Sequence, residues 1–242
     1  MKLISLLEKL EYTCLQGSTD QEVKNVIYDS RKVEEGSLFI CIRGAVVDGH
    51  KFVPDVVAKG AKVLIVEEAV EAPEDVTVIL VKDTRYAMAF ISAAYFGYPA
   101  EKLKTIGITG TKGKTTTTYM VKSILENAGY KVGLIGTIEA IIGDKVIPAK
   151  NTTPESYVIQ EYFHEMAEAG CDCVVMEVSS QGLMLHRTQG FVFDFGIFTN
   201  IEPDHIGPNE HKDFDDYLRC KSLLLKQLSL IHISEPTRHA QI

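Results

Sequence analysis

The feature that most constrains this chain is the segment 103–118, where a short apolar stretch, a glycine-rich turn and a helical pattern follow one another. Ile106 and Ile108 indicate a buried parallel strand, and an apolar helix periodicity begins after Gly113. Glycines let backbone N–H groups converge on an anion, and a helix N-terminus adds positive potential. The order of strand, glycine turn and helix therefore predicts a phosphate-binding loop.

The residues of this loop match a variant of the P-loop pattern. The generic pattern has a glycine five residues before Gly113, where this chain has Ile108. We expect Lys114 to reach the β- and γ-phosphates and the Thr115 hydroxyl to bind Mg²⁺. An ordinary glycine-rich turn is the alternative, but Gly-Lys-Thr between a strand and a helix favours ATP binding. The predicted nucleotide-binding residues are Gly110, Thr111, Lys112, Gly113, Lys114, Thr115 and Thr116.

Length, composition and net charge limit the classes of protein to which this chain can belong. The 242 residues allow one large domain or two ordinary ones, and 45% hydrophobic with 24% charged residues is typical of a globular protein. The net charge of −8 argues against nucleic-acid partners and against binding to a membrane surface. No apolar stretch approaches the roughly 20 residues that cross a bilayer. We therefore expect no nucleic-acid and no membrane partner.

The N-terminus and the cysteines predict a cytoplasmic protein. Residues 1–5 lack the pattern of a signal peptide, and a first amphipathic helix is expected with Leu3, Leu6, Leu7 and Leu10 on one face. The 5 cysteines are scattered, which favours reduced thiols. Cys171 and Cys173 would share one face of a strand, where core filling is the usual role and a metal site the alternative.

Alternating strand and helix patterns predict an α/β fold with a mainly parallel sheet in the second half. The Gly97-Tyr98-Pro99 break places a domain boundary there, between residues 1–98 and 99–228. A hairpin is expected at Gly143-Asp144. The expected strands are 63–66, 76–81, 132–136, 171–177 and 194–201, and the expected helices are 51–60, 86–96, 155–169 and 213–228.

Polar groups follow several of the predicted strands. Glu177 ends a parallel strand, at the sheet edge where α/β proteins bind ligands, and suits a Mg²⁺ ligand or a group that orients water. His205, in Asp204-His205, follows the next strand and is either structural or a metal ligand. Asn151-Thr152-Thr153-Pro154 precedes a helix, where capping is the simplest role and a ligand contact remains open. Ser30 and Arg31, beside Asp29, form either a phosphate- or uracil-binding loop or a solvated turn.

Lys221 lies on the apolar stripe of its predicted helix. Tyr217, Lys221, Leu224 and Leu228 share one helix face. A lysine there either extends its amine to solvent or has a lowered pKa, which leaves a neutral amine that can react with CO₂. The resulting carbamate would be a new carboxylate group.

Taken together, these motifs resemble the Mur ligases of peptidoglycan synthesis, and most closely the branch that acts on UDP-N-acetylmuramoyl-L-alanyl-D-glutamate. The resemblance runs in order through nearly the whole chain to about residue 228. The matching segments are Asp29-Ser30-Arg31, Gly36-x-Leu38-Phe39, Asp48-Gly49-His50, Thr109–Thr116, Asn151–Pro154, Met176–Ser180, Arg187, Phe198–Asn200, Asp204-His205 and Lys221.

The resemblance implies an ATP-dependent amide ligase. In this family ATP forms an acyl phosphate on the substrate carboxylate, and the amine of an amino acid, lysine or diaminopimelate, displaces phosphate. It implies that residues 1–98 bind the UDP part through Ser30 and that residues 99–228 are the central ATP-binding domain. It also implies catalytic roles for Lys114, Glu177, His205 and Lys221. Metal ligands would be Thr115, Glu177, His205 and Lys221 as a carbamate; the muramoyl-dipeptide would contact Asn151, Thr152, Thr153, Ser179 and Arg187.

The chain departs from the family pattern in several places. Lys112 replaces the usual asparagine and would add a cation near the phosphates, and Gln181 replaces a frequent histidine. The segment 201–208 differs from the usual sequence around Asp204-His205. Residues 229–242 match nothing in the family, so we expect a truncated chain with an unrelated tail, without the amino-acid-binding third domain. Such a chain would be a monomer that binds ligands without turnover.

Two other functions remain open. A different amide ligase of the superfamily, such as a folylpolyglutamate synthase or a MurT-like subunit, would share the central domain, but the Asp29-Ser30-Arg31 segment argues against it. A binding module for nucleotide and UDP-sugar without catalysis is the other alternative.

Overall fold

The computed structural model describes residues 1–44, 47–207 and 210–229, which divide into two compact units. The first unit contains Met1–Pro99, Pro154–His164 and Met184–Phe191, and the second contains the other described residues. The sequence predicted two contiguous domains instead. The difference arises because two later segments pack with the first unit. Of the predicted tail, all but Ser229 lies outside the described residues.

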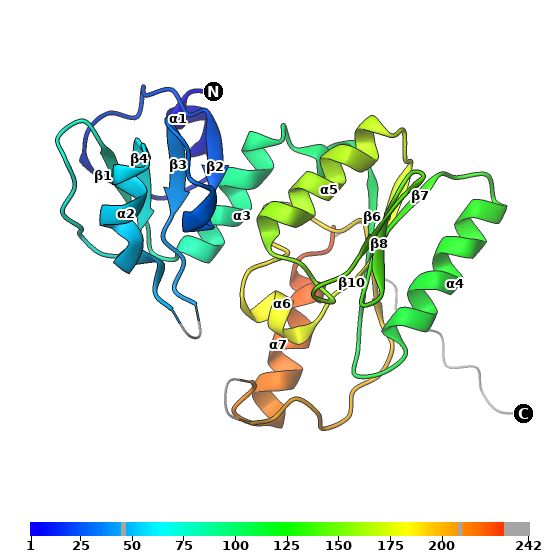
Figure 1. The fold of residues 1–242 in the computed structure, drawn as a ribbon. Coiled ribbons are helices and arrows are strands. Elements are labelled where there is room, and N and C mark those ends of the chain that lie inside the picture. The colour runs from blue at the N-terminus through cyan, green and yellow to red at the C-terminus, as the bar shows by residue number, and fades with distance from the viewer. Residues whose placement is uncertain (45–46, 208–209, 230–242) are drawn as a thin grey trace, which may run out of the picture. The chain divides into compact units, whose positions relative to one another are not determined.

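The first unit is built on a five-stranded sheet with the strand order β1-β5-β4-β3-β2 (Figure 1). β1 is antiparallel to β5, and the other pairs are parallel. The predicted strand 63–66 is confirmed, and the predicted strand 76–81 is shorter by one residue at each end. The strands are β1 (Thr13–Gln16), β2 (Asn25–Ile27), β3 (Ser37–Ile40), β4 (Val63–Val66) and β5 (Thr77–Leu80).

Alternation along β3 gives this sheet two apolar faces. Leu38 and Ile40 belong to a core that includes residues of α1 and α3, whereas Phe39 belongs to a second core with residues of α2. The predicted first helix is a single turn, yet Leu3 and Leu6 are fully buried. The helices are α1 (Leu3–Leu6), α2 (Val53–Ala58) and α3 (Thr84–Tyr95), with short 3₁₀ turns η1 (Ser30–Lys32), η2 (Gly49–Phe52) and η3 (Pro99–Lys102).

The second unit contains a six-stranded sheet with the order β11-β6-β10-β7-β8-β9. The first four strands are parallel, as predicted, and the last two form an antiparallel hairpin that turns at Gly143-Asp144, also as predicted. The strands are β6 (Lys104–Thr109), β7 (Val132–Ile135), β8 (Glu139–Ile142), β9 (Lys145–Pro148), β10 (Cys173–Glu177) and β11 (Phe195–Phe198).

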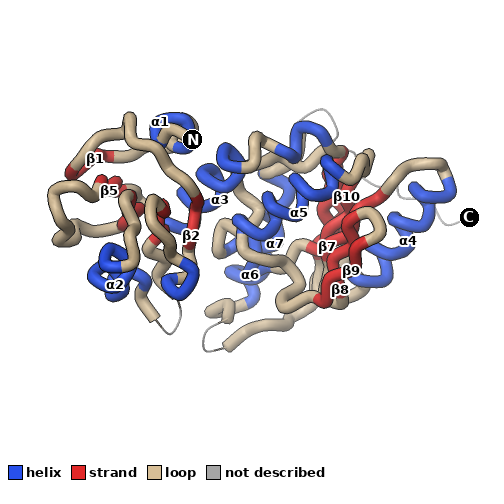
Figure 2. The backbone as a smooth tube through the Cα atoms, turned by 45° about the horizontal axis from the view of Figure 1, so that its top comes forward, coloured by secondary structure: helices blue, strands red, loops and turns tan. Residues whose placement is uncertain are grey.

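Helices cover both faces of this sheet (Figure 2). On one face, Val121 and Leu125 of α4 pack on a core that contains Cys173, which confirms core filling by that cysteine. On the other face, a side chain at Gly107 in β6 would collide with Phe193 and with Leu224 of α7. Gly107 therefore lets α7 approach the strand closely. The helices are α4 (Lys114–Asn127), α5 (Ser156–Glu168), α6 (Ser180–Met184) and α7 (Phe214–Lys226).

The helices agree with the expected ranges to within about three residues. Helix 86–96 begins two residues earlier than predicted, where the Asp83 carboxylate accepts a hydrogen bond from the Tyr86 N–H as a cap. The predicted helix 51–60 is divided into a 3₁₀ turn and α2. Within the described ranges, every helix is too short or too polar to cross a bilayer.

Candidate nucleotide site

The glycine loop follows β6 and ends where α4 begins at Lys114. Gly110 and Gly113 have φ values of +144° and +81°, a region that side chains disfavour. A side chain at Gly110 would also collide with the hydroxyl of Thr199. The backbone N–H groups of Thr111 and Lys112 donate to the backbone and side-chain oxygens of Asn200, at 3.0 and 2.9 Å. The end of β11 therefore fixes the loop that the sequence predicted to bind phosphate.

The two lysines of the loop lie in different environments. Lys114 Nζ is half-buried and donates to the carbonyls of Gly110 and Thr111 at 3.0 and 3.1 Å. Burial lowers the pKa of Lys114. Lys112 is exposed, and its ammonium pairs with Glu202 at 2.6 Å, which raises the pKa of Lys112. The extra cation expected from Lys112 is thus already neutralised by an acidic neighbour.

Glu177 is fully buried at the end of β10, and hydroxyl groups surround its carboxylate. Thr115 and Thr137 each donate a side-chain hydrogen bond to Oε2 at 3.0 Å, and the Thr137 N–H donates to Oε1 at 2.9 Å. Glu177 therefore contacts the P-loop through Thr115, and its role as a Mg²⁺ ligand stays a prediction. Thr137 was not predicted as a site residue, although it follows strand β7 at the same sheet edge.

The Asn151–Thr153 loop lies beside this carboxylate. Thr153 is buried, and its hydroxyl donates to the Glu177 carbonyl at 3.0 Å and accepts from the Ser179 N–H at 2.9 Å. The Thr152 hydroxyl lies 3.0 Å from that of Thr137, and Asn151 is exposed. The Ser179 hydroxyl accepts from a backbone N–H in α6. Thr153 therefore holds the loop in place, and Asn151 is the member open to solvent.

Helix α7 contacts the glycine loop through two buried side chains. Lys221 is 1% exposed, lies 4.7 Å above the Tyr217 ring, and donates to the Gly110 carbonyl at 2.7 Å. Burial, together with repulsion from Lys114, lowers the pKa of Lys221 to about 8. Of the two alternatives that the sequence left for Lys221, the structure shows the buried amine and not the one extended to solvent. The Tyr217 hydroxyl donates to Thr111 Oγ1 at 3.1 Å, a contact that the sequence did not predict.

His205 and Thr116 lie at the surface of this unit. The His205 side chain is half-exposed, and its Nδ1 lies 3.3 Å from a carboxylate oxygen of Glu210. Its ring centroid is 6.1 Å from that of Tyr217. Thr116 is exposed in the first turn of α4. The structure thus brings Thr115, Glu177 and Lys221 to the glycine loop, and leaves His205 on a neighbouring surface segment.

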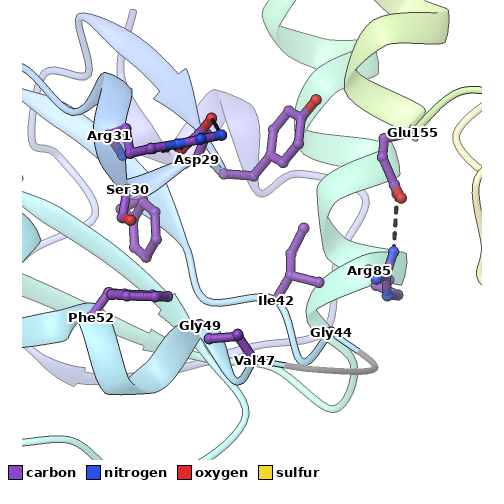
Figure 3. Close-up of a pocket in the computed structure, with 12 residues that line it drawn as sticks. Asp29, Ser30, Arg31, Ile42, Gly44, Val47, Gly49, Phe52, Arg85 and Glu155 are labelled. Carbon is purple, nitrogen blue, oxygen red and sulfur yellow. Dashed lines mark hydrogen bonds and ion pairs between the residues drawn. The ribbon is translucent and has the colours of Figure 1, made fainter. Parts of the chain in front are cut away.

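The first unit holds a separate cavity of about 510 Å³ around Ser30 (Figure 3). Asp29 caps the η1 turn and binds the Arg31 guanidinium at 2.7 Å, which lowers the pKa of Asp29 to about 2. The sequence left these residues between a solvated turn and a binding loop, and they do line a cavity. The lining residues are Tyr28, Asp29, Ser30, Arg31, Phe39, Ile42, Gly44, Val47, Gly49, Phe52, Arg85 and Glu155.

Arg187 lies next to the cavity of the first unit, where it pairs with the lining residue Glu155. The Glu155 carboxylate binds Arg187 at 2.8 Å and Arg85 at 3.0 Å. Arg85 and Glu155 were not predicted as site residues, because their meeting depends on a segment that returns to the first unit late in the chain. Arg187 thus lies in the unit that contains Ser30, whereas Asn151–Thr153 and Ser179 lie in the other.

A parallel α/β sheet with a glycine loop, a lysine at the helix N-terminus and a buried carboxylate on the neighbouring strand defines a P-loop nucleotide-binding protein. Comparison with known proteins narrows this class. Residues 108–234 match the Mur ligase middle domain, and residues 22–96 match the Mur ligase family catalytic domain. The chain belongs to the Mur ligase family, as the sequence motifs indicated.

Curated relatives agree with this assignment. The chain is 49% identical over 238 residues to a UDP-N-acetylmuramoyl-L-alanyl-D-glutamate--2,6-diaminopimelate ligase of Clostridium perfringens (strain 13 / Type A), covering 98% of this chain and 49% of the relative. It is 46% identical to the Clostridium tetani (strain Massachusetts / E88) protein of the same name, covering 97% of this chain and 49% of that protein. The chain therefore spans about half the length of the curated relatives it matches.

A solved structure supports the fold. A structure titled as a UDP-N-acetylmuramoyl-L-alanyl-D-glutamate--2,6-diaminopimelate ligase superposes with a TM-score of 0.78 at 22% sequence identity, covering 94% of this chain and 46% of that one. This similarity establishes the Mur ligase fold and confirms the predicted α/β class with mainly parallel sheets.

Proposed function

We propose that this chain is the ATP- and UDP-substrate-binding part of a ligase that joins an amino acid to UDP-N-acetylmuramoyl-L-alanyl-D-glutamate. The observation that carries the proposal is the contact between Thr115 of the P-loop and the buried Glu177, within a chain of the Mur ligase family. ATP would transfer its γ-phosphoryl group to the free substrate carboxylate, giving ADP and an acyl phosphate. The amine of the amino acid would then attack the carbonyl and release phosphate.

The second unit supplies the phosphate and metal contacts of this proposal. Lys114 and the N–H groups from Gly113 to Thr116 would bind the ATP phosphates, because the N–H groups of Thr111 and Lys112 already donate to Asn200. The Thr115 hydroxyl and the Glu177 carboxylate are hard oxygen donors at the same point, which fits Mg²⁺. Mg²⁺ would neutralise charge on the phosphates. His205 is a candidate ligand for a second metal ion, and its exposed position leaves room for that ion.

Lys221 is proposed to act as a carbamate near the nucleotide. Its pKa of about 8 leaves a reactive fraction of neutral amine at neutral pH, and burial favours a group whose charge a cation can balance. The chain equilibrated with ¹³C-labelled bicarbonate and Mg²⁺ should show a carbamate carbonyl signal by ¹³C NMR. Lys221→Arg should abolish that signal. Retention of the signal in the arginine variant would place the carbamate elsewhere and reject this role.

The substrate contacts divide between the two units. Ser30, in the cavity of the first unit, would bind the UDP part, and Arg187 would bind the muramoyl-dipeptide once it leaves Glu155. Asn151, Thr152 and Ser179 of the second unit would also contact the dipeptide, with Thr153 holding their loop.

Because the curated relatives are named as 2,6-diaminopimelate ligases, we propose diaminopimelate rather than lysine as the amino acid. We also propose a cytoplasmic monomer that binds without turnover.

Calorimetry on the 242-residue chain tests the proposal. We expect Mg-ATP and UDP-N-acetylmuramoyl-L-alanyl-D-glutamate each to bind, and no amide product to form with diaminopimelate. UDP-N-acetylglucosamine is the matched competitor, and it should bind more weakly because it lacks the dipeptide. Equal binding of both UDP-sugars would favour a general UDP-sugar module. Binding of a folate but of neither UDP-sugar would favour a folylpolyglutamate synthase, and absence of ATP binding would reject the proposal.

A further inference from the structure

Three side chains of types that can bind a metal ion gather at the N-terminal half of α7, and none of them is among the residues assigned to Mg²⁺. His211 precedes the helix, and Asp216 and Cys220 lie one turn apart on it. His211 and Cys220 are fully buried, and the Asp216 side chain is 12% exposed. We call these three residues the His211 cluster.

The distances in this cluster fit a small tetrahedral ion. His211 Nδ1 lies 3.3 Å from Asp216 Oδ2, Cys220 Sγ lies 3.9 Å from Asp216 Oδ1, and the three ligand atoms all lie within 4.8 Å of one another. Zinc bonds of about 2.0 Å to nitrogen or oxygen and about 2.3 Å to sulfur separate ligand atoms by roughly 3.3–3.8 Å. The three side chains therefore need only small movements to share one ion.

The surroundings of His211 also match a metal ligand. Its other ring nitrogen, Nε2, lies 2.8 Å from the Ser180 hydroxyl at the start of α6. Histidines that bind metal usually donate their second N–H to such a partner, which fixes the ring orientation and the tautomer. Ser180 would thus hold His211 with Nδ1 directed at Asp216 and Cys220.

We propose that the His211 cluster binds one Zn²⁺ or a similar borderline-soft divalent cation through His211 Nδ1, the Asp216 carboxylate and the Cys220 thiolate. Water would occupy the fourth position. One thiolate and one carboxylate balance the double charge of the ion, so the buried site becomes neutral. Sulfur and imidazole donors select against Mg²⁺, so this site differs in chemistry from Thr115 and Glu177. The proposal does not depend on the ligase function.

Arg219 is the competitor for this site. Its guanidinium donates to Asp216 Oδ1 at 2.6 Å and to Cys220 Sγ at 3.4 Å, and its side chain is 62% exposed. The cation would displace this guanidinium, which can turn into solvent. The Cys220 thiol proton would pass to the buffer when the cation binds.

An ion bound in the His211 cluster would also affect the glycine loop, because α7 connects the two. This helix also carries Tyr217 and Lys221, whose side chains bond Thr111 and Gly110. An ion that ties α7 to His211 and, through it, to α6 should stabilise these contacts. We expect the melting temperature of the chain to rise with stoichiometric Zn²⁺.

Cobalt substitution tests the site directly. The reduced 242-residue chain should bind one equivalent of Co²⁺ with a thiolate-to-cobalt charge-transfer band in the near ultraviolet. One equivalent of Zn²⁺ should remove the band, and a large excess of Mg²⁺ should leave it. Cys220→Ser should abolish the band, whereas the matched control Cys171→Ser should retain it. Arg219→Ala should tighten Zn²⁺ binding several-fold.

Two outcomes overturn the proposal. One is the absence of the band in the folded wild-type chain, which would make the cluster a hydrogen-bond network only. The other is its persistence in Cys220→Ser. Because a variant can fail to fold, X-ray absorption of the zinc-loaded wild-type chain gives an independent reading. We expect one sulfur and three nitrogen or oxygen ligands, and a shell with no sulfur or with several would reject the assignment.

Discussion

At the glycine loop of the second unit, Glu177 and Lys221 are buried and hydrogen-bonded within the protein, whereas Arg31, beside Ser30 at the cavity of the first unit, is exposed. Glu177 and Lys221 are 0% and 1% exposed, but the Arg31 side chain is 84% exposed. Buried groups keep their geometry without a ligand, and surface groups are free to adjust to one. We therefore expect substitutions at the glycine loop to have large effects and substitutions in the cavity to have modest ones.

The largest expected effect is on nucleotide binding by the lysine of the loop. Lys114→Ala should weaken ATP binding by about 100-fold or more, because it removes a charged partner of the phosphates from a partly desolvated site. Isothermal titration calorimetry measures this loss. Lys112→Ala is the matched control, since that ammonium already pairs with Glu202, and it should change the affinity less than about threefold. Equal losses of ATP affinity in both variants would mean that the total positive charge of the loop, and not the position of Lys114, determines ATP binding.

A smaller effect is expected at the buried carboxylate. Glu177→Gln keeps the shape and part of the hydrogen bonding to Thr115 and Thr137 but removes the charge. The increase in ATP affinity that Mg²⁺ produces should fall by roughly tenfold, while binding without Mg²⁺ should change little. Titrations with and without the metal separate the two quantities. A variant that still shows the full Mg²⁺ dependence would remove Glu177 from the metal site.

In the first unit, Ser30→Ala should weaken binding of the UDP substrate by only about three- to tenfold, the effect of one lost hydrogen bond. ATP affinity should be unchanged, which serves as the internal control because Ser30 lies in the other unit. Calorimetry with each ligand gives both values. If the Ser30 variant binds the UDP substrate with wild-type affinity, Ser30 does not form a hydrogen bond with that substrate.

The smallest effect concerns stability and its pH dependence. The pKa of Asp29 is about 2 in the folded chain, below the ordinary value of 3.8, because Arg31 binds the carboxylate. The unfolded chain therefore takes up the proton first, and the stabilisation is present above about pH 4 and is lost as the pH falls toward 2. Since Arg31 is exposed, we expect Asp29→Asn to cost about 1 kcal/mol at pH 7. Urea unfolding should show this difference shrinking in acid; a difference independent of pH would contradict the pairing.

The sequence predicted those parts of the site that depend on local pattern. Gly110, Lys114 and Thr115 follow from strand, turn and helix in immediate succession, and Glu177 follows because parallel strands end at one edge. The burial of Lys221 follows from helix periodicity alone. Each of these predictions needs only a segment of the chain and one geometric rule.

The remaining contacts depend on which distant segments meet. Asn200 lies 88 residues from Lys112, whose N–H it binds, and Tyr217 lies 106 residues from Thr111. Arg85 meets Glu155 over 70 residues because part of α5 packs with the first unit. Polar side chains of this kind are common on any surface, so no local pattern marks them. Thr137 is the exception, since its place after β7 at the same edge could have revealed it.

Gly107 has a consequence for how sequence variants of this protein will be interpreted. Because Gly107 has no side chain, Phe193 and Leu224 pack directly against the backbone of β6. The distance between this strand and α7 therefore depends on the absence of a Cβ atom at position 107. An alanine there would force the Phe193 and Leu224 side chains to shift, and so disturb the packing of α7, the helix that carries Lys221 and Tyr217. A genetic screen would then record a nucleotide-binding defect at a core position that contacts no nucleotide, and purified protein would be needed to trace that phenotype to the position of a helix.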